Sequence, residues 1–190
     1  MPIREATPQD LDAIMAIVQA GKAIMAASGN PSQWKGDYPD RAQFLSDMAR
    51  GECYVLEEDH IPQAVFVLAI GAEPYYSFIQ DGSWPNDRPY GTIHRLASNG
   101  KVKGVFPQMV EFCLTKIPTL RIDTHRDNGI LQHLALKHGF QFCGTVFLPD
   151  GDPRAGLPAG RRWGQISCGS IKNRCLHSIG RQRFLHPLAG

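Results

Sequence analysis

Two glycines and two lysines in the run SNGKVKGVF, residues 98–106, have the composition of an anion-binding turn. Gly100 and Gly104 let the backbone come close to a ligand, because a residue without a Cβ adopts conformations that other residues avoid. The apolar stretch that follows predicts a helix, whose unpaired N–H groups and positive dipole end favour phosphate. Lys101 and Lys103 would add positive charge, although lysines in a turn are usually solvated surface. The turn therefore predicts a pyrophosphate site, with a plain surface turn as the alternative.

Two common phosphate-binding motifs are missing from this turn. The pattern GxxxxGK[ST] of a P-loop is absent, and so is the GxGxxG pattern of a Rossmann dinucleotide site. The flanking elements must therefore decide what the turn does. A strand-like run at 91–98 precedes it, and a strand at 120–125 and a helix that starts at Asn128 follow its own helix. This arrangement favours a phosphorylated cofactor.

The rest of the chain predicts further helices and strands around this segment. Thr7-Pro8-Gln9-Asp10 combines a hydroxyl N-cap, a proline and an acid in the pattern that begins a helix, and Pro39 opens a second helix. Two strands separated by a short polar turn suit an antiparallel hairpin, and the second is nearly all apolar, hence central. The predicted strands outside the opening segment are 2–6, 53–58, 62–71 and 140–148.

Composition limits the class of protein. At 190 residues with 43% apolar residues, the chain is long enough for one well-buried core. A formal charge of +2 gives no argument for nucleic acid, and no apolar run approaches the roughly 20 residues that span a bilayer. Five cysteines without a CxxC pair suit reduced thiols in a cytosol and suggest no metal site. We therefore expect a cytoplasmic protein without metal, membrane or nucleic-acid partners.

Here the residues resemble a known family. The order helix, helix, antiparallel strands, then K-x-x-G-x-F, helix, strand and N-x-x-x-x-x-L-x-x-K-x-G-F is similar to the GNAT superfamily of acyl-CoA N-acyltransferases, over about residues 3–148. The family's loop pattern is Gln or Arg, two residues, Gly, one residue, then Gly or Ala. Lys101, Gly104 and Phe106 occupy those places, and two of them depart from the pattern. The N-terminal IREATPQDLDAI resembles the family's first strand and helix.

The resemblance implies an α/β fold of the α+β kind: a mixed central sheet with two splayed parallel strands, flanked by about four helices. The strands at 91–98 and 120–125 would splay apart and hold the pantetheine arm of acetyl-CoA between them. Backbone N–H groups near Leu96 or Ala97 would stabilise the developing oxyanion. The residues expected at the cofactor are Leu96, Ala97, Lys101, Val102, Lys103, Gly104, Val105, Phe106, Asn128 and Gln132.

The implied reaction is direct transfer of an acetyl group from acetyl-CoA to a primary amine of a small molecule or a peptide. His94 lies in the first splayed strand, and an unperturbed histidine pKa of about 6.5 suits a general base. Asp123 in the second strand is the next candidate, although either residue could be purely structural. The family's usual general acid is a tyrosine that directly follows the leucine matching Leu134, and this chain has Ala135 there. Water, Tyr90 or His133 would then protonate the thiolate, or it would leave unassisted.

Two loops rich in aromatic residues would cover the cleft in this family. Trp34 and Tyr38 lie in one, and Trp84 and Tyr90 lie in the other, so we expect all four to line the acceptor site, with core packing as the alternative. Members often pair through C-terminal strands, which makes a homodimer possible. Ala135 and the atypical turn also leave two other functions open: a CoA-binding sensor or regulatory module without catalysis, and a phosphate-binding enzyme of different chemistry.

The C-terminal segment departs from the family in a specific way. Residues 1–150 form the expected domain, and 151–190 form a basic tail with seven basic residues and one acid. Chains of the family often end in Pro-Arg-x-Ala-Tyr-Gln, whereas this one continues as PRAGLPAG. Ala155 to Gly160 can be written GCT GGC CTA CCA GCG GGC, and reading from the second base gives Leu-Ala-Tyr-Gln-Arg. We therefore hypothesise a frameshift after Arg154, with a genuine basic extension as the alternative.

Overall fold

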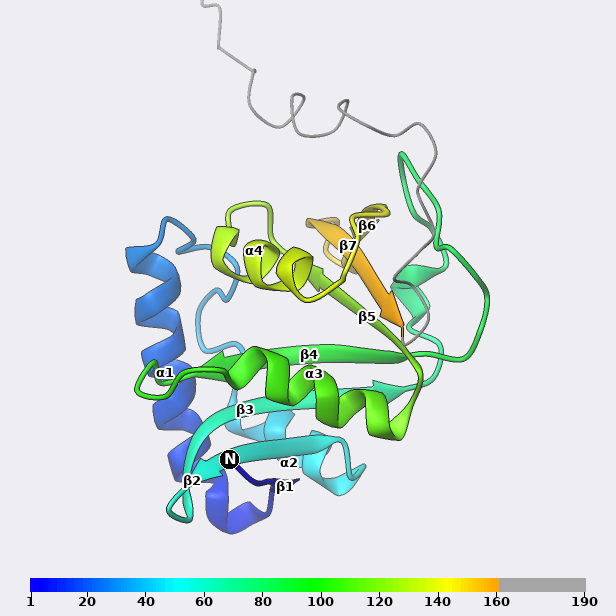
Figure 1. Cartoon of the computed structure of the whole chain (residues 1–190). Coiled ribbons are helices and arrows are strands. Elements are labelled where there is room, and N and C mark those ends of the chain that lie inside the picture. The colour runs from blue at the N-terminus through cyan, green and yellow to red at the C-terminus, as the bar shows by residue number, and fades with distance from the viewer. Residues whose placement is uncertain (161–190) are drawn as a thin grey trace, which may run out of the picture.

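One seven-stranded mixed sheet organises residues 1–160, the part of the chain that the computed structural model describes (Figure 1). All neighbouring strands are antiparallel except β4 and β5, which are parallel. In spatial order the strands are β1 (Ile3–Glu5), β2 (Cys53–Glu58), β3 (Ile61–Ile70), β4 (Gly91–Ser98), β5 (Thr119–Thr124), β7 (Pro153–Gly160) and β6 (Gly144–Phe147). The predicted antiparallel hairpin and its central second strand are confirmed as β2 and β3.

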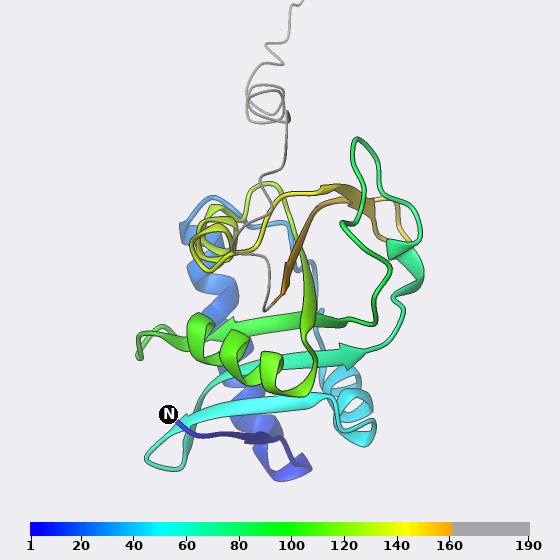
Figure 2. The same cartoon turned by 45° about the vertical axis from the view of Figure 1, so that its right-hand side comes forward.

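Four α-helices cover the two faces of this sheet: α1 (Leu11–Ala27), α2 (Arg41–Ala49), α3 (Val105–Lys116) and α4 (Gly129–Lys137). Successive side chains of a strand point to opposite faces. Val65 and Val67 of β3 accordingly pack in the core under α1 and α2, whereas Phe66 packs in the core under α3 and α4. Figure 2 shows the two helix pairs on opposite sides of the sheet.

The first two helices begin where side chains can bond their free N–H groups. Thr7 and Asp10 form the expected capping box, but the chain first makes the 3₁₀ turn η1 (Pro8–Asp10) and α1 starts only at Leu11. The second helix begins at Arg41 rather than at Pro39, because Asp40 is the N-cap and its carboxylate accepts a hydrogen bond of 2.7 Å from Gln43 N. Both differences move a helix start by only a few residues.

The parallel strands β4 and β5 pair over a short stretch and then separate, as the resemblance implied. Their register ends at Ile93 opposite Ile122, and the rest of β4 diverges from β5 (Figure 1). On its other edge β4 carries a bulge: Val67 pairs with His94 and Val65 pairs with Ala97, so β4 has one extra residue. Arg95 in this bulge has a left-handed φ of 48°. Consecutive side chains of β4 can therefore point to the same side.

The last described strand lies inside the segment that the sequence set apart as a tail. β7 pairs with β5 over residues 155–160 and with β6 along its first half. The expected domain boundary at residue 150 thus falls just before a strand of the sheet. Residues 161–190, which include most of the basic tail with Cys168 and Cys175, lie outside the described residues. Within 1–160, no helix is both long and apolar enough to cross a membrane.

Candidate functional site

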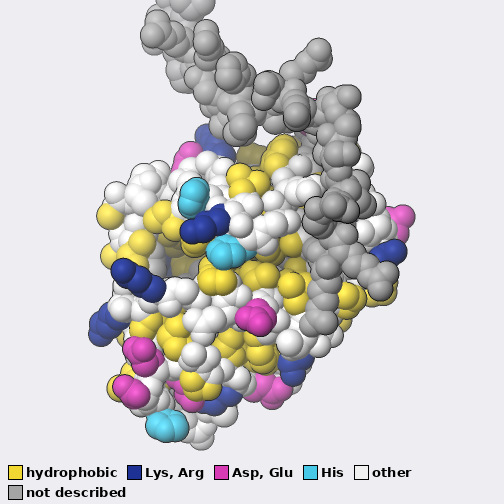
Figure 3. Space-filling model, in the orientation of Figure 1, with side chains coloured by type: hydrophobic (Ala, Val, Ile, Leu, Met, Phe, Trp, Pro, Cys, Tyr) yellow, Lys and Arg dark blue, Asp and Glu magenta, His cyan; other side chains and the backbone are white. Residues whose placement is uncertain are grey.

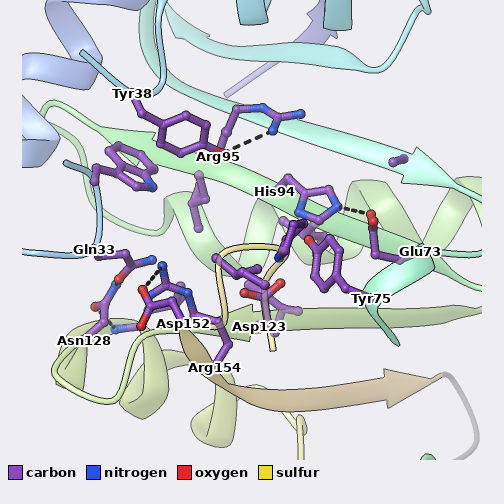
Figure 4. Close-up of a pocket in the computed structure, with 18 of the residues that line it drawn as sticks. Gln33, Tyr38, Glu73, Tyr75, His94, Arg95, Asp123, Asn128, Asp152 and Arg154 are labelled. Atoms are coloured by element: carbon purple, nitrogen blue, oxygen red, sulfur yellow. Dashed lines mark hydrogen bonds and ion pairs between the residues drawn. The ribbon is translucent and has the colours of Figure 1, made fainter. Parts of the chain in front are cut away.

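A cavity of about 690 Å³ opens where β4 and β5 separate. Its floor comes from Ile93 and Ile122 at the last paired position of the two strands, and Figure 4 shows the polar side chains that surround it. Three loops complete the wall: the α1–α2 loop, the loop between β3 and β4, and the β6–β7 loop. The splayed strands thus produce a hollow at the centre of the sheet, as the resemblance predicts.

His94 lies in the wall of this cavity and faces a carboxylate. His94 Nε2 is 3.0 Å from Glu73 Oε2, and the two side chains are only 14% and 18% exposed. Glu73 is held in turn, because its backbone N–H donates to Tyr90 Oη at 2.9 Å. With Nε2 directed at Glu73, Nδ1 is the ring nitrogen left to face a ligand. A carboxylate in this position orients the imidazole.

Asp123, the second candidate base, lies in the same wall on β5. Its Oδ2 accepts a hydrogen bond of 2.7 Å from Tyr76 Oη. Burial raises the pKa of Asp123 above its usual value, while the hydrogen bond from Tyr76 and the charges of His94 and Arg154 partly oppose that rise. Burial likewise raises the pKa of the Tyr76 phenol. The cavity therefore contains a carboxyl group that ionises less readily than an exposed aspartate.

An arginine cluster forms the side of the cavity nearest α2. The bulge turns Arg95 into the wall next to His94, and its Nε lies 2.7 Å from Oδ2 of the fully buried Asp47. Arg50 pairs with the same carboxylate and also bonds Glu52. Tyr38 Oη lies 3.4 Å from Arg95 Nη1. Because two arginines face two acids, this cluster is close to neutral.

The first turn of α4 is tied to the loop that follows α1. Asn128 caps α4 through Oδ1, which accepts from Leu131 N, while its Nδ2 donates to Gln33 Oε1 at 2.9 Å. Gln132 Nε2 bonds the carbonyls of His125 and Arg126, so this side chain fastens the turn before α4. Both residues expected at the cofactor therefore shape the cleft in this structure, and Asn128 also lines the cavity.

The glycine and lysine turn has the conformation that its composition predicts. Gly100 and Gly104 have φ of 77° and 75°, and Gly104 directly precedes α3 without a side-chain cap. Val105 and Phe106 then begin the helix with N–H groups that have no intrahelical acceptor. Their side chains are buried, so only their backbone can meet a ligand. Lys101 and Lys103 are exposed beside them.

The remaining cofactor candidates lie on β4 and in the turn. Leu96 lines the cavity, whereas Ala97 is buried against α1, where its Cβ lies 3.3 Å from the position of a Cβ at Gly21. Val102 and Leu96 both pack against a small buried cluster that includes Val105. Apolar side chains also gather on the face that carries α3 and α4 (Figure 3). The lip of the cleft next to the turn is thus apolar, which suits an extended pantetheine arm.

The four aromatic residues expected at the acceptor site divide into two groups. Trp34 and Tyr38 line the cavity. Trp84 and Tyr90 do not, because both pack on the guanidinium of Arg121, whose Cζ lies 4.1 and 3.7 Å from their ring centroids. Their role in this structure is to support the loop before β4, which is the packing alternative. Tyr75, from the same loop, lines the cavity instead.

Neither residue suggested as proton donor for the thiolate reaches the cavity. His133 is exposed on α4, and the Tyr90 hydroxyl accepts the hydrogen bond from Glu73. Ala135 is fully buried in the core under α3 and α4. Among cavity residues, Tyr75 and Tyr38 carry hydroxyl groups. Burial raises the pKa of the Tyr75 phenol, so it stays protonated at neutral pH.

Several polar residues of the site were not foreseen from sequence, and three of them carry much of its geometry. Glu73, Gln33 and Arg154 all line the cavity, and each comes from a segment without helix or strand periodicity or from the doubtful end of the chain. No local pattern marks Glu73 and Gln33, because their partners His94 and Asn128 meet them only through the fold, and Arg154 reaches the cavity only through the pairing of β7 with β5 and β6. Among residues 1–160, no group of three potential metal-binding side chains comes together.

Comparison with known proteins agrees with this geometry. No family model and no curated protein matches the chain. Several solved structures do match the chain. One of them, a GNAT-family acetyltransferase from Streptococcus agalactiae, is 29% identical in sequence, and the match has a TM-score of 0.71 and covers 84% of this chain and 95% of the other chain. A putative acetyltransferase from Staphylococcus aureus is 24% identical, with a TM-score of 0.63 over 84% and 99%.

A third structure extends the likeness to a complex with bound molecules. AAC(6')-Ib with ribostamycin and coenzyme A is 20% identical, with a TM-score of 0.59 over 87% of this chain and 98% of its own. At this identity the match shows the fold alone. The strand order, the splayed parallel pair and these matches lead to one conclusion: the chain has the fold of the GNAT superfamily of acyl-CoA N-acyltransferases, which supports a role in acyl transfer.

Proposed function

We propose that the protein is an acetyl-CoA-dependent N-acetyltransferase that acts on a primary amine of a small molecule or a peptide. The observation that carries this proposal is the contact between His94 and Glu73 in the wall of the cavity between β4 and β5. A histidine with an oriented ring and one free nitrogen, beside a cleft for an extended cofactor, is the arrangement that direct transfer to an amine needs.

The cofactor would bind along the splayed strands. Its pyrophosphate would meet the N–H groups of Val105 and Phe106, with Lys101 and Lys103 close by. Its pantetheine arm would follow the free edge of β4 toward Leu96. The thioester carbonyl would then lie near the bulge, where a backbone N–H at Leu96 or Ala97 would stabilise the oxyanion. The complexes of structural neighbours with coenzyme A and with isobutyryl-CoA support a cofactor of this class.

In the reaction, the neutral amine attacks the thioester carbonyl and a new N–C bond forms. His94 Nδ1 accepts the proton from the amine nitrogen, and Glu73 stabilises the resulting imidazolium. The C–S bond breaks, and coenzyme A leaves as a thiolate. Tyr75 is placed to protonate this thiolate, although a thiol pKa of about 8.5 makes departure tolerable without help. Asp123 adds negative charge beside the acceptor and serves as the alternative base.

Two measurements test this proposal. Calorimetry should show that acetyl-CoA binds, and a panel of primary amines should contain some that release the coenzyme A thiol in the presence of the protein. A protein that binds no acetyl-CoA would contradict the assignment of the cleft. A protein that binds it but acetylates no amine would contradict the assignment of the reaction.

A further inference from the structure

We propose that the acceptor amine carries a carboxylate close to its nitrogen and that Arg154 binds this carboxylate, so that the acceptor belongs to the class of amino acids. This inference rests on the proposed acetyl transfer and names its acceptor. Arg154 comes from β7 and is only 6% exposed, yet it lines the cavity (Figure 4). Its Nη2 lies 2.9 Å from Asp152 Oδ2, whereas its Nη1 is buried without a hydrogen-bond partner.

An arginine nitrogen in this state favours a ligand oxygen. A buried N–H without an acceptor is unfavourable, and an acceptor that arrives with the substrate would satisfy it. Asp152 occupies one edge of the guanidinium and holds the side chain in place. The other edge is then free to bond one carboxylate oxygen, and the guanidinium is already oriented before the ligand binds.

The position of Arg154 relative to His94 sets the size of the acceptor. Asp123 lies between the two residues, and the charges of both act on it (Figure 4). An amine that reaches His94 and Glu73 on one side of Asp123 therefore needs its anionic group only a few bonds away to reach Arg154 on the other side. A free amino acid has this spacing, whereas the lysine side chain of a protein has no such group.

The other cations around the cavity fit this role less well. Arg95 and Arg50 share the buried carboxylate of Asp47, and Arg50 also bonds Glu52. Lys35 is exposed to solvent. Asp150 and Asp152 also line the cavity, together with Asp123 and Glu73. So many acids would repel a dianion such as a phosphate ester, and they favour an acceptor with one ammonium and one carboxylate.

The test compares amino acids with their carboxamides as acceptors, because each pair differs only in the charge of one group. We expect kcat/KM to favour the acid by about ten- to one-hundredfold, the range for a hydrogen bond to a charged group. Arg154→Gln should abolish this preference, because KM for the acid should rise far more than KM for the amide. Arg154→Lys should retain part of it.

Two further variants separate recognition from folding. Asp152→Asn weakens the ion pair that orients the guanidinium and should raise KM for amino acids more than KM for their amides. Arg4→Gln removes an arginine that pairs with Asp10 and Glu57 away from the cavity, and it should leave the preference intact. If Arg154→Gln fails to fold, Arg154→Lys and Asp152→Asn still decide the role of the guanidinium.

The possible outcomes distinguish this inference from the proposed function. Equal use of acids and amides, or an equal loss for both in the Arg154 variants, would overturn the carboxylate assignment but keep the acetyltransferase. If acetyl-CoA binds and no amine reacts, calorimetry should measure whether amino acids bind to the protein loaded with coenzyme A. Absence of binding would overturn the assignment of Arg154 as a carboxylate site. A protein that binds neither acetyl-CoA nor any amine would overturn the proposed function itself.

Discussion

Tyr76 donates a hydrogen bond of 2.7 Å to Asp123, and this contact links the loop before β4 to the second splayed strand. The Tyr76 ring is itself packed on Trp84 and Tyr90. These three aromatic residues thus hold Asp123 and Glu73 in the wall of the cavity, although none of the three lines it. The packing of this loop therefore determines the geometry of the site.

Replacing Asp123 by asparagine should stabilise the protein at neutral pH. Burial raises the pKa of Asp123 in the folded state above its ordinary value of 3.8. The protonated form is therefore favoured on folding, and stability falls as the pH rises through the folded-state pKa. Asp123→Asn cannot ionise and can still accept from Tyr76, so we expect Tm at pH 7 to rise by about 2–4 °C, the shift that about 1 kcal/mol produces at this size.

Thermal melts at several pH values check this expectation. The gain from Asp123→Asn should shrink as the pH falls toward 3.8, where both states of the wild-type residue are increasingly protonated. Asp37→Asn, at an exposed loop position, should show no such dependence. A lower Tm for Asp123→Asn at pH 7 would mean that the carboxylate stabilises the fold, contrary to the argument from burial.

Replacing Glu73 by glutamine should slow turnover. The amide keeps the shape of the side chain but cannot stabilise an imidazolium at His94, so we expect kcat to fall about ten- to one-hundredfold, as for partial loss of general base catalysis. KM for acetyl-CoA should change little. Glu52→Gln removes another cavity carboxylate, one that bonds Arg50, and is the matched control. Equal kcat values for the two variants would remove Glu73 from the mechanism.

The lysines of the turn before α3 should contribute to cofactor affinity. Replacing Lys101 and Lys103 together by alanine removes two exposed charges beside the N-terminus of α3. Each exposed charge pair contributes about 0.2–1 kcal/mol, so loss of both should raise Kd for acetyl-CoA about two- to thirtyfold, with the difference shrinking at high salt. Calorimetry measures this, and a Lys116 and Lys137 double alanine variant is the control. Unchanged affinity would place the phosphates elsewhere.

Strand β7 is paired on both edges, yet it is rich in residues that rarely occur inside a sheet. It lies between β5 and β6, yet residues 153–160 contain two prolines and two glycines, which are poor strand formers. Pro158 is tolerated because its carbonyl accepts from Gln141 N, so the edge without an N–H faces away from β5. A Cβ at Gly156 would lie 3.0 Å from Trp84 Cη2. The proline and glycine content suits the hypothesised frameshift after Arg154, whereas the close fit of Gly156 against Trp84 suits the chain as written, so the frameshift stays a prediction.

The frameshift hypothesis predicts a more stable protein when the frame is restored. The variant combines Ala155→Leu, Gly156→Ala, Leu157→Tyr, Pro158→Gln and Ala159→Arg. If the restored frame is the native one, its better strand formers should outweigh the close contact of a Cβ at position 156 with Trp84 and the burial of an arginine at position 159, so we expect its Tm to be higher by several degrees. Sequencing the gene from independent DNA is the direct check, and an intact frame there would end the hypothesis. A lower Tm for the variant would favour the chain as written.

Much of the fold was predictable because it depends on local signals. The capping box at Thr7 and Asp10, the hairpin of β2 and β3 and the helix that starts at Asn128 all follow from residue types at fixed spacing. Helices α1 and α2 begin a few residues later than predicted, because a 3₁₀ turn precedes α1 and Asp40 is the N-cap of α2. The bulge at Arg95 carries no such signal, since it arises from pairing between β3 and β4.

The site was predictable only where a strand or a motif marks it. His94 and Asp123 lie on the two splayed strands, and the structure brings both into one cavity. Glu73 depends on its contact with His94, and Arg154 depends on the pairing of β7 with β5, so no local pattern could select either residue. The aromatic composition of the loop predicted that Trp84 and Tyr90 line the site. Both rings instead pack on the guanidinium of Arg121 and support the loop before β4.

The most direct test of the account is mass spectrometry of the acceptor amine after incubation with labelled acetyl-CoA. We expect the labelled acetyl group to appear on the amine nitrogen in equal amount to the thiol released. His94→Ala should lower this rate about one-hundredfold or more and alter its pH dependence, while acetyl-CoA still binds. An unchanged rate and pH profile in His94→Ala, or thiol release without an acetylated amine, would contradict the account.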